Sequence, residues 1–117
     1  MIQEEPIFFE DLALSDDVLD ALYDMRFEKC TPVQARCIPP ILEGQDVIGI
    51  AQTGTGKTAA YLLPLLTLLK QESHPTDAVN CLVMAPTREL AQQIDQALQG
   101  FGYYVDVNGV AVYGGND

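Results

Sequence analysis

The stretch Ala51-Gln52-Thr53-Gly54-Thr55-Gly56-Lys57-Thr58 decides the fold prediction for this chain of 117 residues. It follows a short apolar run, Val47–Ile50, and it precedes an apolar-periodic segment, Ala59–Leu69. This order predicts a strand, a glycine-rich loop and a helix, which together form a phosphate-binding loop. The backbone N–H groups of such a loop converge on an anion, and the N-terminus of the helix adds the positive end of its dipole.

Lys57 and Thr58 are the residues of this loop that we expect to act on a nucleotide. Lys57 can reach a β- or γ-phosphate, and the hydroxyl of Thr58 can ligate Mg²⁺. The generic pattern G-x-x-x-x-G-K-[ST] would place glycine where the chain has Ala51. The alternative is a glycine-rich turn that binds nothing, but it leaves the Lys57 cation at a helix N-terminus, where a cation is disfavoured.

The chain is acidic, with a formal net charge of −11. Residues 1–28 hold nine of the 17 acidic residues and only one basic residue, Arg26. The net charge argues against a broad basic surface for nucleic acid, although most of the acidity belongs to this N-terminal segment, which is interpreted as a solvated helix face.

Composition also indicates the compartment. No apolar run approaches the roughly 20 residues that cross a bilayer, so no membrane association is expected. The N-terminus lacks the basic start of a secretory signal. Cys30, Cys37 and Cys81 are odd in number and form no C-x-x-C pair, so they are expected to be reduced core thiols of a cytoplasmic protein, rather than metal ligands or a disulfide.

Helices and strands alternate in the expected order of an α/β protein. Helices are predicted to start at Ser15, at Thr31-Pro32, after the glycine-rich loop and at Thr87. The second should be broken at Pro39-Pro40, and the third should run through Lys70 with a kink at Pro64. Strands are predicted at Asp46–Ile50 and Val79–Ala85, in a parallel sheet. The lone histidine, His74, is expected to be an exposed loop residue.

The C-terminal segment has two readings. Tyr103–Tyr113 has the local pattern of a β-hairpin with a tight turn at Asn108-Gly109. The alternation of strands and helices favours instead one more parallel strand at Val110–Tyr113.

Three further pieces suggest a ligand site beside the loop. Gln34 lies early in the second predicted helix, and its amide offers the donor and acceptor that complement N7 and N6 of adenine. Phe9 is an apolar ring in an acidic stretch that could stack on a base. Pro86–Ala91, P-T-R-E-L-A, lies where a strand turns into a helix, the edge at which open α/β sheets bind ligands. Singly, each has a plain alternative, as a surface polar residue, a core residue or a helix cap.

Together, these pieces resemble the N-terminal part of the first RecA-like domain of a DEAD-box ATP-dependent RNA helicase. The family's glutamine motif, G-F-x-x-P-T-P-I-Q, aligns with R-F-E-K-C-T-P-V-Q at residues 26–34. Arg26 replaces its glycine and Cys30 its first proline. The family's A-x-T-G-x-G-K-T fits residues 51–58 fully, so Ala51 is expected there. P-T-R-E-L-A and Gly114-Gly115 match two further motifs.

The resemblance implies a role for each matched residue. Gln34 would read adenine and Phe9 would stack on it. The phosphates of ATP or ADP would be wrapped by Gln52, Thr53, Gly54, Thr55 and Gly56, with Lys57 on β and γ and Thr58 on Mg²⁺. The sugar–phosphate backbone of single-stranded RNA would be contacted without regard to sequence by Pro86, Thr87, Arg88, Gly114 and Gly115.

The resemblance also implies a fold: α/β, a truncated RecA-like (P-loop) parallel sheet with flanking helices, preceded by an N-terminal helical segment. Residues 1–44 would form that segment with the glutamine motif, and residues 45–117 a partial ATP-binding domain. The sequence contains neither the D-E-A-D nor the S-A-T motif. We therefore expect the chain alone to bind nucleotide without hydrolysing it, and its unpaired strand edges to favour strand exchange or a homo-oligomer.

Two other functions stay open on the residues alone. One is a different phosphate-loop ATPase or kinase, in which Gln34 would have no role in ATP binding. The other is a non-enzymatic module whose acidic segment, residues 1–28, docks a basic partner.

Overall fold

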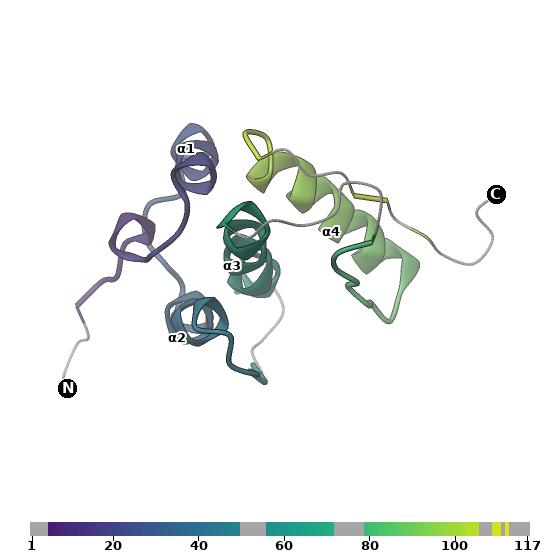
Figure 1. The fold of residues 1–117 in the computed structure, drawn as a ribbon, viewed down its shortest axis with the longest axis horizontal. Coiled ribbons are helices and arrows are strands. Elements are labelled where there is room, and N and C mark those ends of the chain that lie inside the picture. The colour runs from purple at the N-terminus through teal and green to yellow at the C-terminus, as the bar shows by residue number, and fades with distance from the viewer. Residues whose placement is uncertain (1–4, 50–55, 72–78, 106–108, 111, 113–117) are drawn as a thin grey trace.

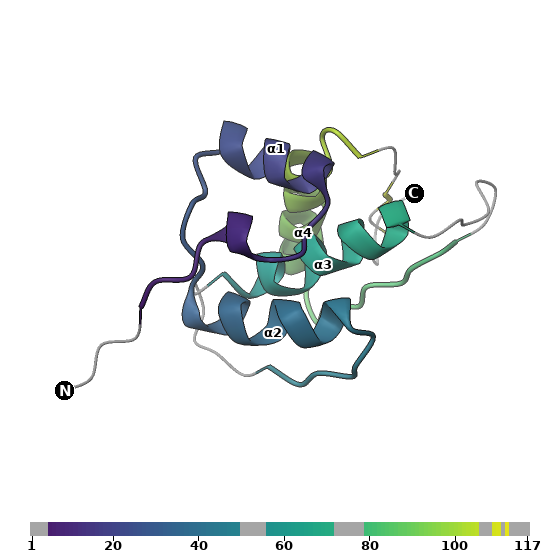
Figure 2. The ribbon, with the colours of Figure 1, turned by 60° about the vertical axis from the view of Figure 1, so that its left-hand side comes forward.

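The regular structure of the described part of the chain is helical. The computed structural model describes residues 5–49, 56–71, 79–105, 109–110 and 112. In chain order its elements are η1 (Phe9–Asp11), α1 (Asp16–Asp24), α2 (Pro32–Leu42), α3 (Lys57–Gln71) and α4 (Arg88–Phe101). Helix α3 lies in the middle, with α1, α2 and α4 packed around it (Figures 1 and 2).

The helices begin where the sequence predicts. Ser15, Thr31 and Thr87 are the N-caps of α1, α2 and α4, and each side-chain oxygen accepts a hydrogen bond from a backbone N–H three residues on. Each cap satisfies a donor that the first turn would otherwise leave unpaired. The caps therefore confirm three predicted helix starts.

The core is built around α3. Its alanines and leucines face the other helices because they recur at helical spacing. The buried cluster consists of Phe9, Leu14, Val18, Leu22, Ile38, Ala59, Leu62, Leu63, Leu66, Phe101 and Val105. The N-terminal segment, η1 and all four helices are thus joined in one hydrophobic core.

One fully buried polar side chain, Thr67, ties α3 to the start of α1. Its hydroxyl donates to the Leu63 carbonyl at 3.0 Å and accepts from the Ser15 N–H at 3.2 Å. A buried hydroxyl without partners would cost free energy, but this one is paired in both roles. The contact fixes the position of the Ser15 cap against the central helix.

Helices α1 and α2 end in the same turn, with different residues at the critical position. After α2, Gly44 has φ +81°, and the N–H groups of Gly44 and Gln45 bond to carbonyls of the last helical turn. After α1, Arg26 has φ +62°, and the N–H groups of Arg26 and Phe27 do the same. Both are Schellman motifs, which favour glycine at this position. Arg26 therefore has a backbone conformation that favours glycine, although it carries a side chain.

The predicted break at Pro39-Pro40 is wrong. Helix α2 runs unbroken from Pro32 to Leu42. Both prolines lie in its last turn, where their fixed φ suits a helix. Each lacks the N–H that would bond to the carbonyl four residues back, but the helix continues past both to Leu42. Their carbonyls still accept hydrogen bonds, from Glu43 at 3.2 Å and from Gln45 at 3.0 Å. Helix α3 likewise continues through Pro64.

The predicted strands are not formed among the described residues. Residues 46–49 and 79–85 carry no ladder, Ile48 is 93% exposed, and Leu82, in the run expected to be a buried strand, is 79% exposed. A strand needs a neighbour for its N–H and C=O groups. Among the described residues neither segment is paired with a neighbouring strand, so their apolar composition alone does not produce a sheet.

The described residues of the C-terminal segment form neither the β-hairpin nor the additional parallel strand. Tyr103–Val105 forms turns that extend the end of α4, which is not the first strand of a hairpin. Val110 and Val112 are exposed and lie in no strand. Residues 106–108, 111 and 113–117 fall outside the described residues, as does His74. Within the described ranges, no helix has the length and apolar character needed to cross a membrane.

Candidate nucleotide site

Three segments meet at the candidate site: residues 7–9, residues 28–34 and the start of α3. The Phe9 N–H donates to the Glu28 carbonyl at 2.9 Å, and the Cys30 N–H donates to the Ile7 carbonyl at 2.8 Å. These bonds hold the segment with Phe9 beside the strand-like approach to α2. Gln34, on the first turn of α2, then reaches across to Gly56.

Gln34 is the centre of this arrangement. Its Oε1 accepts from the Thr31 N–H at 2.8 Å, and the Thr31 Oγ1 accepts from the Gln34 N–H at 3.4 Å. This reciprocal pair is a capping box. Its Nε2 donates to the Gly56 carbonyl at 3.2 Å. The side chain is 5% exposed, so its position is fixed in the absence of a nucleotide.

The amide of Gln34 still has capacity for adenine. An amide oxygen can accept two hydrogen bonds and an amide nitrogen can donate two, and one of each is used here. The remaining acceptor and donor are the pair that N6 and N7 of adenine require. Because the side chain is almost covered, a purine reaches this edge only if neighbouring atoms move aside.

Gly56 is required by geometry at the N-terminus of α3. Its φ is +84°, which strains any residue with a side chain. A Cβ there would collide with the Gln34 amide nitrogen and approach Thr31 Oγ1 to 3.3 Å. Its carbonyl also accepts from the Ala60 N–H at 3.2 Å. The glycine thus permits close contact between α2 and the start of α3.

Lys57 and Thr58 occupy the first turn of α3. Lys57 is exposed and Thr58 is half-buried. Tyr61, one turn on, has its pKa raised by burial, and a hydrogen bond with the Thr58 side chain partly offsets that rise. The Thr58 hydroxyl is a hard oxygen of the type that Mg²⁺ takes together with phosphate and water. Gln52, Thr53, Gly54 and Thr55 lie outside the described residues.

Phe9 lies in the core. It is 3% exposed and belongs to the same buried cluster as Leu22 and Leu63. The ring therefore has no open face in this structure, and stacking on a base would require its cover to move. The structure brings its backbone near residues 28–30, but it does not present the ring to a ligand.

The predicted RNA-contacting residues lie at the N-terminus of α4. Pro86, Thr87 and Arg88 are exposed, and Thr87 Oγ1 accepts from the Leu90 N–H at 3.1 Å. A helix N-terminus favours anions, so the position suits a phosphate. Gly114 and Gly115 lie outside the described residues.

Sequence reasoning missed several contacts that build the site. The capping role of Gln34 was visible in the pattern Thr31-x-x-Gln34, which is a capping-box signature. The contact between Gln34 and Gly56 joins residues that are 22 positions apart, and no local pattern indicates it.

The thiol of Cys30, beside η1, is expected to be unreactive at neutral pH, because burial and then the charge of Asp11 raise its pKa to about 11.

Comparisons with known proteins agree with the motifs. The sequence model of the DEAD/DEAH box helicase family matches residues 31–117. The chain is 52% identical over 108 residues to the ATP-dependent RNA helicase DeaD of Escherichia coli, covering 92% of this chain and 17% of that protein. It is 49% identical over 109 residues to the DEAD-box ATP-dependent RNA helicase CshA of Bacillus cereus, covering 93% and 20%. The chain thus spans a fifth or less of these relatives.

Solved structures show the same relationship. The crystal structure of the RNA helicase Prp28 from Chaetomium thermophilum bound to ADP superposes with a TM-score of 0.85 at 38% identity, covering 98% of this chain and 29% of that one. A DEAD box protein from Methanococcus jannaschii superposes with a TM-score of 0.82 at 32% identity, covering 98% and 31%. The backbone therefore follows the path of RecA-like helicase domains. With its glutamine motif, phosphate loop and P-T-R-E-L-A run all in register, this chain belongs to the DEAD/DEAH box helicase family.

Proposed function

We propose that this chain is the part of an ATP-dependent RNA helicase that binds adenine nucleotide. The observation that carries the proposal is the hydrogen bond from Gln34 Nε2 to the Gly56 carbonyl, at 3.2 Å. It joins the residue suited to adenine directly to the last glycine of the phosphate loop. A purine held by Gln34 and a phosphate held at the N-terminus of α3 would then belong to one site.

The proposed roles follow the motif. Gln34 reads adenine, residues 52–56 surround the phosphates, Lys57 contacts β and γ, and Thr58 helps to hold Mg²⁺. The ion, when bound, neutralises charge on the β- and γ-phosphates. Phe9 is a proposed stacking partner only after it leaves the core. A cytoplasmic location is also proposed, supported by three free cysteines.

RNA binding is proposed for Pro86, Thr87 and Arg88, with Gly114 and Gly115. The support is their motif match and the exposed N-terminus of α4, which offers backbone N–H groups to phosphate. Duplex unwinding with ATP hydrolysis is proposed for the whole protein, since the relatives are about five times as long. The chain itself contains no D-E-A-D carboxylate, so we propose that alone it binds ATP without hydrolysing it.

The parallel sheet and the division into residues 1–44 and 45–117 also stay proposals. Residues 46–49 and 79–85 expose apolar side chains and belong to no ladder among the described residues, as expected of strand sequences that lack a neighbouring strand. We propose that they become strands when an edge is supplied, by the rest of a longer protein or by strand exchange between copies. Light scattering that shows only a folded monomer at high concentration would contradict the exchange.

Isothermal titration calorimetry tests the nucleotide proposal. ATP and ADP should bind with Mg²⁺, GTP should bind about tenfold more weakly or worse, and Lys57→Ala should weaken ATP binding without unfolding the chain, because Lys57 is exposed. Equal binding of GTP and ATP would favour a different phosphate-loop ATPase. No binding of any nucleotide would refute the proposal.

A further inference from the structure

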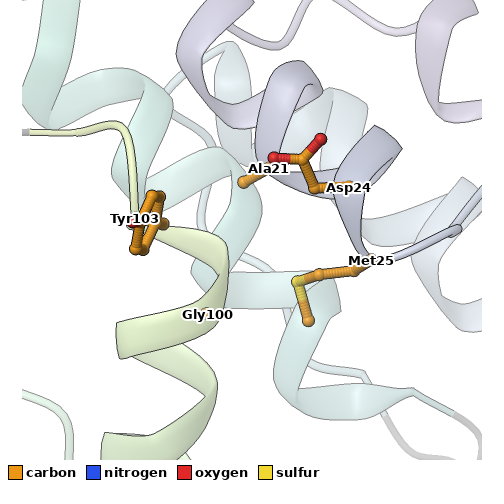
Figure 3. Close-up of a pocket in the computed structure, with 5 residues that line it drawn as sticks. All are labelled: Ala21, Asp24, Met25, Gly100 and Tyr103. Atoms are coloured by element: carbon orange, nitrogen blue, oxygen red, sulfur yellow. The ribbon is translucent and has the colours of Figure 1, made fainter.

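A shallow pocket of about 280 Å³ lies between the C-terminal ends of α1 and α4. Ala21, Asp24 and Met25 of α1 line one side, and Gly100 and Tyr103 at the end of α4 line the other. Figure 3 shows these five residues around the space, with the side chains of Asp24 and Met25 across from the Tyr103 ring. The pocket contains none of the residues that are proposed above to bind nucleotide or RNA.

The walls of this pocket are apolar and partly aromatic. Met25 packs against Gly100, where an added Cβ would lie 3.3 Å from the Met25 methyl carbon. Tyr103 is 76% exposed, and its ring meets the Tyr104 ring edge-on at 5.0 Å between centroids. Aromatic and methionine side chains of this kind are enriched where proteins bind other proteins.

The rim of the pocket is negative. Asp24 accepts a hydrogen bond from the Tyr104 hydroxyl. Asp20 is exposed and lies four residues before Asp24 on α1, so the two carboxylates share one face of the helix. The hydrogen bond to Asp24, burial and the negative charges of both carboxylates raise the pKa of Tyr104. The carbonyl ends of α1 and α4 also point here, and neither helix has a basic residue in its last turn.

Few cations compensate this charge. Lys70 pairs with Asp17 at 3.0 Å, one turn before Asp20. Arg26 follows α1 directly, but in the described part of the chain it makes no ion pair with Asp20 or Asp24. The pocket therefore combines an apolar floor with uncompensated carboxylates and two negative helix ends.

We propose that this pocket docks a basic peptide segment of a partner protein, with an arginine side chain as its anchor. The alkyl part of the arginine would lie on Met25 and Ala21, and the planar guanidinium would stack on Tyr103 and bond to Asp24. An RNA strand would be repelled by the same carboxylates. A second copy of this chain, with its net charge of −11, lacks the charge to complement them.

Fluorescence anisotropy with a labelled peptide, Gly-Leu-Arg-Ser-Leu-Arg-Gly, tests the proposal on the 117-residue chain at physiological ionic strength. The same peptide with citrulline in place of each arginine is the probe without charge. The test variant is Asp20→Asn with Asp24→Asn, which keeps an acceptor for Tyr104. The matched control is Glu43→Gln with Asp46→Asn, which removes two exposed carboxylates at the far end of α2.

The proposal expects saturable binding of the arginine peptide and none of the citrulline peptide. Asp20→Asn/Asp24→Asn should weaken binding about tenfold, the control double variant less than about twofold, and Tyr103→Ser about fivefold. Tyr103 is exposed, so its replacement should leave the thermal unfolding of the chain unchanged. Absence of binding, or equal losses in the two double variants, would show that only the overall charge attracts the peptide and would overturn the proposal.

Discussion

The side-chain amide nitrogen of Gln34 donates a hydrogen bond of 3.2 Å to the backbone carbonyl of Gly56. The same side chain closes the capping box of α2 through Thr31. One residue therefore fixes the start of α2 and links it to the start of α3. A ligand that engages this amide would act on the phosphate loop through a single hydrogen bond.

Two substitutions at Gln34 separate these functions. Gln34→Ala removes both contacts, and should lower the free energy of unfolding by about 1–2 kcal/mol in urea titrations followed by circular dichroism. Gln34→Glu keeps an oxygen for the Thr31 N–H but cannot donate to the Gly56 carbonyl. It should be no more stable than the alanine variant, because its second carboxylate oxygen would face the Gly56 carbonyl at a site that is 5% exposed, and it should lose ATP affinity by about tenfold. Unchanged ATP affinity in Gln34→Glu would show that the link has no part in binding.

Gly56→Ala should destabilise the chain for two separable reasons. The φ of +84° disfavours a side chain by about 1–2 kcal/mol, and the added Cβ collides with the Gln34 amide. Gln34→Ala relieves the collision but not the backbone strain. The double variant should therefore be more stable than the sum of the two single losses predicts, by a coupling of at least about 0.5 kcal/mol. Strict additivity of the urea-unfolding free energies would contradict this contact.

Arg26→Gly should stabilise the chain. Arg26 holds φ +62° in the turn after α1, and glycine relieves a strain of about 1 kcal/mol there. Gly44→Ala, in the same turn after α2, is the matched control and should destabilise by a similar amount. Thermal unfolding of both variants, compared with the unchanged chain, measures the two changes in stability. A decrease in stability for Arg26→Gly would mean that the arginine side chain contributes more than its backbone costs.

The thiol of Cys30 should stay protonated well into alkaline pH. Burial and Asp11 raise its pKa from 9.0 to about 11, and only the thiolate reacts with iodoacetamide. Its alkylation rate, followed by mass spectrometry, should still rise about tenfold between pH 9 and pH 10, because the pKa lies above that range. The urea-unfolded chain is the control, in which the rate should begin to level near pH 9. Levelling near pH 9 in the folded chain would contradict the raised pKa.

Local signals in the sequence predicted the helix starts, but the long-range contacts could not be predicted from the sequence. Ser15, Thr31 and Thr87 are readable because a cap acts on a backbone N–H three residues away. The hydrogen bond between Ser15 and Thr67 joins residues 52 positions apart, and nothing in either neighbourhood indicates it. The apolar run at residues 79–85 predicted a strand that the described residues do not form, because a strand also needs a neighbour, which depends on the rest of the fold.

For the candidate site too, the sequence predicted the residue types but not how they are packed. The residue types of the glutamine motif and the phosphate loop indicated a nucleotide site, and the structure brings Gln34 and Gly56 together. Phe9 is buried, which was the alternative to its predicted stacking on a base; a single aromatic residue in an acidic stretch carries no signal of which neighbours cover it. Arg26 replaces a glycine of the family pattern, and only the backbone angles show that the glycine conformation is kept.

A crystal structure of the chain grown with Mg²⁺ and a non-hydrolysable ATP analogue tests the central claim most directly. We expect the adenine N6 and N7 within hydrogen-bonding distance of the Gln34 amide, and the phosphates at the N-terminus of α3 beside Gly56 and Lys57. A purine bound elsewhere, or a phosphate site left to water with Gln34 turned to solvent, would contradict the account.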